Sequence, residues 1–445
     1  MRLRLILTVF ALRALWGQTP DDALSIRNDL DFLNLRKRVA ARIPGFFGPG
    51  DPVTKADSLL RKKIGFLNSN CLQLSFRADS LARGYLTASL KIKMDRALLV
   101  MEPTLKVGRS PDYPTHLWKD FAAGDIISGY LRIPFEHFKI IAGRYPFYDG
   151  PAFGDPFFFS GELPPLDLLG FTFEKGHFGF LYLFSPLGLY LPDSTQKYLN
   201  YHKLTFSPTS SMTFYFSEAA LYGGRNAPPD PYYVNPFLLY YPRLWNRRIV
   251  DENILWSFGF NSVVGNRIFY GELVIDDFPY TVERNEHPKL AWLLGTILGH
   301  PLGLEHLFLR LSYRGATRWT FGHKSSWLSF THEGVPLGPP DGNDFDRISL
   351  DIDRRFNRGE LVVALDFRRK GEGDPEEKEP SGDFPDPFFL TGVVEKRLSF
   401  GIGLLIVKKQ VLGFRARYSR FWNYENREGT TRSLFNLSLF ALYRI

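Results

Sequence analysis

Residues 270–280 read Tyr-Gly-Glu-Leu-Val-Ile-Asp-Asp-Phe-Pro-Tyr, a β-strand pattern that places carboxylates among strongly apolar neighbours. Successive side chains of a strand point to opposite faces, so Glu272 and Asp276 share one face while Leu273 and Ile275 share the other. A soluble sandwich would bury the apolar face. A membrane barrel instead turns that face toward lipid and the polar face toward its lumen. The rest of the chain decides between the two folds.

The same alternation recurs along the chain, each time with charged or polar residues on one face. The clearest segments are 305–314, 347–353, 360–368 and 435–445. A half-buried strand of a soluble protein could show this pattern once, but its repetition with charges on the polar face indicates a membrane barrel. Charges of both signs are interleaved on that face, so we expect them to pair across the interior and help to fill it.

The spacing of the turns gives the strand number. From residue 85 onward, strands join in pairs through brief turns, and each pair is followed by a longer connection. Short turns on one side and long loops on the other are typical of outer-membrane barrels. The pattern predicts an all-β fold: a transmembrane antiparallel barrel of about eighteen strands over residues 70–445.

The N-terminal part of the chain has a different character. Residues 1–17 combine Arg2 and Arg4 with a short apolar run, as a secretory signal peptide does. Residues 18–69 contain two candidate short helices, which we expect at the periplasmic mouth; a leader without fixed structure is the alternative. No later run approaches the roughly 20 apolar residues of a spanning helix, so strands would have to cross the membrane.

Composition limits the classes of function. The chain has 445 residues with 16% aromatic residues, a net charge of +8 and a single cysteine, Cys71, which excludes an intramolecular disulfide framework. The positive charge favours an acidic partner such as lipid head groups or anionic glycans. Export and the absence of a basic helix argue against nucleic acid.

Catalytic and metal-binding motifs are missing from the sequence. There is no Gly-x-Ser-x-Gly, no His-Glu-x-x-His, no Walker loop and no cysteine metal spacing. His300 with His306, or His332 beside Glu333, lacks an evident third ligand. We therefore expect no enzyme activity, no cofactor and no metal, although a serine and a histidine brought together by folding would make an outer-membrane lipid or glycan hydrolase a weaker alternative.

Several short motifs occur in a recognisable order. They are Tyr201 to Leu204, Ser217 to Gly224, Tyr233 to Phe237 followed by Tyr240-Tyr241, Asp251 to Asn253, and Gly271 to Phe278, preceded by Gly143-Arg144 and Gly150-Pro151. In this order they resemble the Wzi-type capsule assembly proteins over about half of the chain. The resemblance implies an eighteen-stranded barrel in the bacterial outer membrane, with N-terminal helices on the periplasmic side and a lectin-like role in holding capsular polysaccharide.

The resemblance also marks family positions, which we expect to brace the barrel and its loops. They are Arg144, Glu218, Asn235, Glu272, Asp276 and Asp277. Glu218 and Arg144 fall on the apolar parity of their strands, which predicts a bulge or a position beyond the lipid belt. Glu272 and Asp276 lie about 13 Å apart along one strand, so each should have its own partner, with lumen arginines as candidates.

The long loops carry candidate glycan-binding residues, because aromatic rings stack on sugars and arginines pair with acidic groups. The candidates are Tyr145, Tyr148, Arg225, Tyr232, Tyr233, Arg243 and Arg247. The alternative is that the aromatic residues pack the loops together or form the interfacial girdle. The leading hypothesis is a monomeric, non-enzymatic barrel that binds or anchors an acidic surface polysaccharide, and the main alternative is a channel or transporter for small solutes.

Overall fold

The computed structural model describes most of the barrel region of the chain. It covers residues 71–79, 84–94, 96–107, 122–151, 157–160, 164–190, 195–246, 251–277, 287–304, 306–356, 359–380, 387–407 and 411–444. The predicted signal peptide (1–17), the predicted helical segment (18–69) and Arg247 lie outside the described residues.

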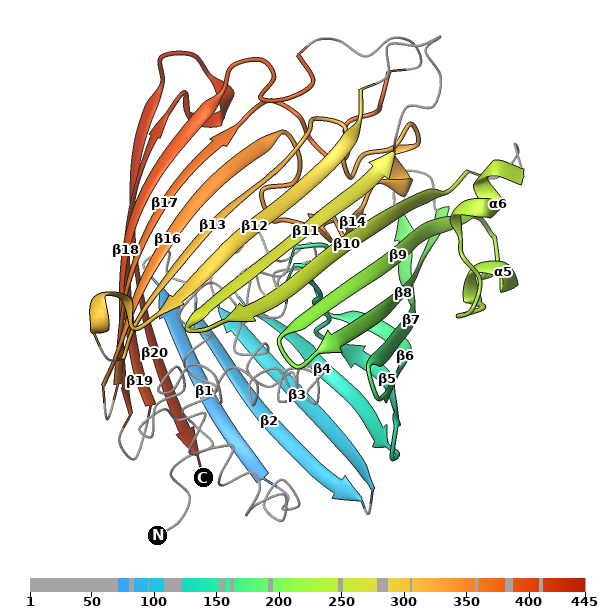
Figure 1. The fold of residues 1–445 in the computed structure, drawn as a ribbon, viewed down its shortest axis with the longest axis horizontal. Coiled ribbons are helices and arrows are strands. Elements are labelled where there is room, and N and C mark those ends of the chain that lie inside the picture. The colour runs from blue at the N-terminus through green and yellow to red at the C-terminus, as the bar shows by residue number, and fades with distance from the viewer. Residues whose placement is uncertain are drawn as a thin grey trace.

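Eighteen antiparallel strands form one closed barrel, as the turn spacing predicted (Figure 1). They are β1 (Cys71–Asp79), β2 (Gly84–Met94), β3 (Ala97–Val107), β4 (Ala122–Pro134), β5 (Phe138–Tyr145), β6 (Leu166–Lys175), β7 (Phe178–Tyr190), β8 (Thr195–Thr209), β9 (Met212–Arg225), β10 (Asn253–Val264), β11 (Arg267–Asp277), β12 (Lys289–Gly299), β13 (Leu307–Ala316), β16 (Phe345–Phe356), β17 (Gly359–Lys370), β18 (Glu395–Val407), β19 (Val411–Trp422) and β20 (Thr431–Arg444). Each strand pairs with its sequence neighbours in the barrel, and β1 closes the ring by pairing with β20 as well as β2. Closure leaves no free sheet edge.

The two faces of β11 show whether residues 270–280 belong to a soluble sandwich or to a membrane barrel. Glu272 and Asp276 are buried inside the barrel, with 4% and 6% of their surface exposed. Phe269 and Leu273, on the other face, are 38% and 41% exposed. Polar residues inside and apolar residues outside are the reverse of a soluble sandwich, so the apolar face is the one that meets lipid.

The apolar outer surface continues around the barrel. Exposed outward-facing residues include Leu105, Leu169, Leu204, Phe214, Phe258, Leu294, Leu311, Ile348, Leu365, Phe400, Phe414 and Phe435. In the described part of the chain, no helix is both long enough and apolar enough to cross a membrane.

The connections differ between the two ends of the barrel. At the end called the inner end here, turns such as Gly176-His177 and Gly265-Asn266 join strands directly, with Gly176 and Gly265 at positive φ. At the opposite, outer end lie the long connections β5–β6, β9–β10, β13–β16 and β17–β18. They carry the small elements α5 (Pro231–Val234), α6 (Tyr241–Asn246), η2 (Ser326–Leu328), β14 (Thr331–His332) and β15 (Val335–Pro336). The short helix η3 (Tyr424–Asn426) also lies at the outer end, and η1 (Pro301–Gly303) lies at the inner end.

Two inward-facing tyrosines lie flat over glycines of the neighbouring strand. Tyr215 on β9 is paired with Gly259 on β10, and Tyr270 on β11 is paired with Gly295 on β12. A methyl group at Gly295 would lie 2.2 Å from Cζ of Tyr270, and one at Gly259 would lie 2.0 Å from Cζ of Tyr215. The absence of a side chain at these glycines is what lets the rings cover the wall.

Candidate functional site: the occluded outer end of the lumen

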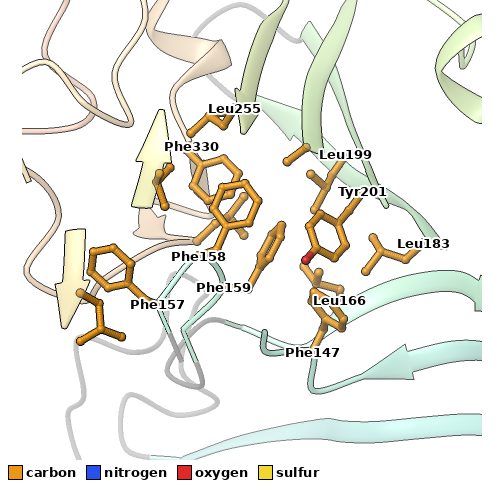
Figure 2. Packing of buried hydrophobic residues seen from close by; sticks show 14 of the residues in the cluster. Phe147, Phe157, Phe158, Phe159, Leu166, Leu183, Leu199, Tyr201, Leu255 and Phe330 are labelled. Carbon is orange, nitrogen blue, oxygen red and sulfur yellow. The ribbon is translucent and has the colours of Figure 1, made fainter. Parts of the chain in front are cut away.

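Two connections at the outer end fill the lumen with an aromatic core (Figure 2). We call the described residues 146–151, 157–160, 164–165 and 317–344 together the plug. Phe158 and Phe159 come from the first connection and Phe330 from the second, and all three are fully buried. The rings of Phe158 and Phe330 stack at 5.5 Å, and Phe159 meets the inward-facing Tyr201 of β8 at 4.9 Å. The plug therefore packs on the wall as a protein core does.

Backbone hydrogen bonds join the two halves of the plug. The N–H of Ser160 donates to the carbonyl of Leu337 at 2.8 Å, so residues far apart in sequence share one layer. Lys197, on the inward face of β8, donates to the carbonyls of Ser329 and Thr331 at 2.7 and 2.8 Å. These bonds satisfy buried backbone groups that would otherwise be unpaired, which fixes the plug relative to the wall.

Carboxylates at and beneath the plug accept hydrogen bonds from wall and plug. Asp149 accepts from the hydroxyl of Tyr201 and, at 2.7 Å, from Nζ of Lys203. Glu272 accepts from Oγ of Ser257 at 2.5 Å. The hydrogen-bond partner found for Glu272 is thus a hydroxyl, whereas lumen arginines had been the expected candidates.

Asp276 reaches the other half of the plug. Its Oδ2 accepts a 2.7 Å hydrogen bond from the backbone N–H of Phe321. Because Glu272 accepts from Ser257 and Asp276 accepts from Phe321, the two carboxylates of β11 each have a separate partner, as their spacing predicted.

The β17–β18 connection is tied to the plug by buried polar contacts. Asp344 accepts from the backbone N–H of Gly373 at 3.0 Å and from Oγ1 of Thr391 at 2.6 Å. Lys289 pairs with Glu379 at 2.9 Å, and both are buried. The plug and the described residues of the β17–β18 connection are thus hydrogen-bonded to each other, and we call them together the cap.

Below the cap, the lumen face of β16–β18 carries a network of arginines and carboxylates. Asp341, at the end of the plug, lies 2.8 Å from Arg368 and 3.5 Å from Arg347. Asp366 pairs with Arg347 and, at 3.1 Å, with Arg397. The interleaved charges of these strands are therefore paired, as predicted. Burial alone would raise the pKa of Asp341, but the surrounding arginines outweigh it and hold that pKa well below its usual range.

Arg144 lies on the outside of the barrel. Asp167, its neighbour on β6, also points outward, and Nη2 of Arg144 lies 2.9 Å from the carboxylate of Asp167. Nη1 of Arg144 lies 3.3 Å from the carboxylate of Asp125. Arg144 lies on the lipid-facing side of its strand, as the alternation predicted. The strand pairing at Arg144 shows no bulge. The pair of carboxylates explains how a guanidinium is held on this wall.

Glu218 also points outward and is nevertheless fully buried. Its carboxylate accepts from the backbone N–H groups of Tyr240 and Tyr241 at 2.6 and 2.9 Å, and from Nε1 of Trp256 at 2.8 Å. Nε2 of His202 lies 3.2 Å away. The predicted bulge is absent here too, because the register at Glu218 is unshifted against both β8 and β10. The β9–β10 connection, which folds back over the outside of the wall, covers the charge instead.

That connection, residues 226–252, brings several predicted residues together. We call residues 226–246 the outer flap. The carboxylate of Asp230 caps α5 by accepting from the N–H of Tyr232 at 2.9 Å and binds Arg243, whose guanidinium lies 4.8 Å from the ring centroids of Tyr232 and Tyr233. Oδ1 of Asn235 accepts from the N–H of Phe237 at 3.1 Å.

Glu252 fixes the base of the outer flap. The hydroxyl of Tyr233 donates to its carboxylate, and both side chains are buried. Burial, together with the nearby charge of Asp230, raises the pKa of Glu252 to about 8. The carboxyl therefore keeps its proton over much of the neutral range.

The remaining predicted residues are spread around the outer end. Tyr145 and Tyr148 are buried, with Tyr145 edge-on to Tyr130 at 4.9 Å. Arg225 is exposed at the outer end of β9. Asp277 ends β11, next to a register shift against β12. A glycan role for these residues stays a prediction.

Sequence reasoning missed a pair at the β19–β20 connection that joins a half-buried tyrosine to an exposed arginine. Arg432 donates from Nη1 to the hydroxyl of Tyr424 at 2.6 Å, and its guanidinium lies 4.7 Å from the centroid of that ring. Arg427, beside them, pairs with Glu425 at 3.5 Å. Their spacing in sequence carries no motif, since the turn at η3 is what brings them together.

Acidic residues mark another part of the outer surface. In the β17–β18 connection, Glu372, Asp374 and Glu376 are exposed. Among the described residues, no group of three or more His, Cys, Asp and Glu side chains is placed to hold a metal ion.

Comparison with solved structures places the fold. Wzi of Escherichia coli, described as an outer-membrane protein involved in group 1 capsule assembly and a carbohydrate-binding β-barrel, superposes with a TM-score of 0.64 at 13% identity, covering 94% of this chain and 98% of that chain. The outer membrane protein OprD of Pseudomonas aeruginosa gives a TM-score of 0.47 at 9% identity, covering 84% and 94%. Neither a family model nor a curated protein sequence matches this chain. The likeness to Wzi confirms the barrel fold.

Proposed function

We propose that this chain is an exported outer-membrane barrel, without enzymatic activity, that binds or anchors surface polysaccharide at its outer end. The observation that carries the proposal is the plug: the outer part of the lumen is filled by a buried aromatic core that is hydrogen-bonded to the wall. A passage for solutes needs open space, whereas a binding protein needs a fixed surface. The fold it shares with Wzi, a carbohydrate-binding barrel, supports the same proposal.

The most suitable groups for a glycan are the half-buried Tyr424 and the exposed Arg432. A tyrosine face and an arginine fork recognise a sugar ring and an acidic substituent together. Arg225 and Arg247, predicted from the sequence, belong to the same proposal as further cations for an acidic chain. The exposed carboxylates Glu372, Asp374 and Glu376 would repel such a chain, which directs it toward the β19–β20 connection.

Direct binding tests the proposal. We expect the purified monomeric barrel to retain an acidic capsular polysaccharide on a sensor surface. Arg432→Gln and Tyr424→Ala should each weaken retention several-fold, since such sites rely on a few stacked and charge-assisted contacts. Arg267→Gln, which removes the same charge from an exposed residue at the inner end, is the matched control. Equal retention by all variants would contradict the assignment of the site.

Planar-bilayer recording tests the channel alternative. The plug and the paired lumen charges lead us to expect little or no current from the intact barrel. Large, steady, ion-selective steps without polysaccharide binding would favour the channel and overturn the proposed function. Turnover of lipid or glycan by the purified protein would favour the hydrolase.

A further inference from the structure

The lipid-facing surface is deep on one side of the barrel. On β18, the lipid-facing positions from Ile406 at the inner end to Leu398 are all apolar and exposed. The next lipid-facing position toward the outer end is Lys396. At the usual rise these nine residues span about 27 Å along the strand, or roughly 20 Å along the membrane normal for a strand tilted by about 40°. That is close to the roughly 25 Å of a full apolar belt.

On β8 and β9 the corresponding surface is interrupted halfway. Counting from the inner turn, the outward residues Met212, Phe214 and Phe216 of β9 are apolar, but the next outward residue is Glu218. The residue paired with Glu218 on β8 is His202, and the next lipid-facing residue of β8 toward the outer end is Asn200. The apolar run on β9 covers only about 14 Å of strand, about half the depth found on β18.

The outer flap covers this polar half of the wall. It lies outside the barrel beyond β8 and β9 (Figure 1). The ring of Tyr240 packs against that of His202 with centroids 4.6 Å apart, and the carbonyl of Val234 accepts from the hydroxyl of Tyr182 at 2.6 Å. Glu218 accepts hydrogen bonds from backbone N–H groups of the flap. Polar groups that lipid could not have satisfied are therefore bonded and shielded by protein.

The flap's own outer surface is apolar. Phe237 is 81% exposed, Leu239 54% and Val234 37%. The ring of Phe237 stacks on that of Phe180 at 6.2 Å, and Phe180 is in register with the exposed Leu204 of the wall. The exposed apolar side chains of the flap thus continue the lipid-facing row of β7–β10 toward the outer end.

From these observations we propose that the outer flap is embedded in the outer leaflet, where Phe237 and Leu239 contact lipid acyl chains and complete the belt that β8 and β9 leave unfinished. A connection lying in water would gain nothing by exposing these two side chains, whereas at the membrane each contributes buried apolar area. The inference concerns lipid and does not rest on the proposed polysaccharide binding.

Depth measurement by spin labelling tests the proposal. Cys71 is the only cysteine, so a Cys71→Ser background accepts single labels at Phe237→Cys and Leu239→Cys. Phe258→Cys, on the exposed outer face of β10, is the lipid reference, and Glu333→Cys, exposed on the plug, is the water reference. Folding of each variant in vesicles is checked first by the heat-modifiable shift on a gel.

We expect labels at residues 237 and 239 to be relaxed by oxygen and protected from a water-soluble nickel complex, as at residue 258. Relaxation by the nickel complex at the level of residue 333 would overturn the proposal. Protection from both relaxants would also overturn it, because the flap would then be covered by another protein or a second copy of this chain. If the label at residue 237 perturbs the flap, the label at residue 239 gives an independent reading.

Discussion

Asp276, on the lumen face of β11, accepts a 2.7 Å hydrogen bond from the backbone N–H of Phe321 in the plug, 45 residues further along the chain. Both residues are buried. Asp276→Leu would leave this N–H without its acceptor, at a cost of about 1–3 kcal/mol. We expect the variant to lose its folded gel mobility at a lower temperature than the parent.

Asp276→Asn is the matched control for that experiment, because an amide oxygen can still accept from Phe321. It should lose less heat resistance than the leucine variant. Equal and unchanged heat resistance in both variants, combined with lost polysaccharide binding, would move Asp276 from bracing to the binding site.

Asp341→Asn tests the charge network under the plug. The change removes the carboxylate that Arg347 and Arg368 share, while Arg347 keeps Asp366 and Arg368 keeps Glu395. The cost should therefore be smaller than the about 3–5 kcal/mol that follows when a buried charge loses its sole partner. We expect a clear drop in the urea midpoint of the barrel. Glu333→Gln, at an exposed plug position, should leave the midpoint unchanged.

Docking of the outer flap should weaken as pH rises. The pKa of Glu252 is raised from 4.5 to about 8 by burial and by Asp230, so the folded protein holds a proton that the open segment releases. The contribution to docking is fully present below about pH 4.5 and is lost as pH rises through about 8. Limited proteolysis of the outer flap, residues 226–246, should therefore accelerate between pH 5 and 8, and Glu252→Gln should flatten this dependence. Cleavage rates that fall with pH in the parent protein would contradict the assignment.

The plug should respond to pH in the opposite sense. Burial lowers the pKa values of His323 and His332 from 6.5 to about 4, the former despite the nearby Asp251. Stability that depends on their neutral forms is complete above about pH 6.5 and is lost as pH falls through about 4. We expect the thermal midpoint of the parent protein to fall on acidification. The thermal midpoint of the double variant His323→Gln, His332→Gln should fall less over the same pH range. His137→Gln, exposed at an inner turn, serves as the control.

Glycine at residue 295 should be required because the ring of Tyr270 occupies the space of a side chain. Gly295→Ala would place a methyl group 2.2 Å from that ring, whereas the nearest neighbour of a methyl group at Gly403 is a carbonyl oxygen at 3.9 Å. Overpacking of this kind typically costs about 1–3 kcal/mol. Denaturant unfolding should show the loss for Gly295→Ala only, and an unaffected Gly295→Ala variant would mean that Tyr270 can move away.

The barrel could be predicted from the sequence because each strand carries its own local signal. The alternation of Glu272 and Asp276 with Leu273 and Ile275 is fixed by backbone geometry alone, and the turns at Gly176 and Gly265 mark the strand ends. The parity of Glu218 was predicted correctly for the same reason. The residues that cover Glu218 could not be predicted in this way. The flap residues that bond to it lie more than twenty positions away in the sequence and are not part of a periodic pattern.

The partners of the loop residues were also beyond local pattern. An aromatic side chain such as Phe158 or Tyr233 packs equally well on a sugar or on another ring, so composition cannot say which occurs. Arginines were the expected partners of Glu272 and Asp276 because charge favours charge. The structure gives Glu272 the hydroxyl of Ser257 and gives Asp276 a backbone N–H of the plug, a donor that nearly every residue carries and that a sequence pattern therefore does not single out.

The pairing of β1 with β20 has a consequence for how the barrel forms. Gln73 lies opposite Arg444, so this seam joins the two extremes of the described chain. Contacts of such sequence separation carry the highest loop-closure entropy and therefore form late. Until they do, β1 and β20 both present unpaired backbone edges, which invite strands from other chains. We therefore expect assembly to be limited by the meeting of these two strands, and a peptide that copies β20 to compete for the edge of β1 during folding but not afterwards.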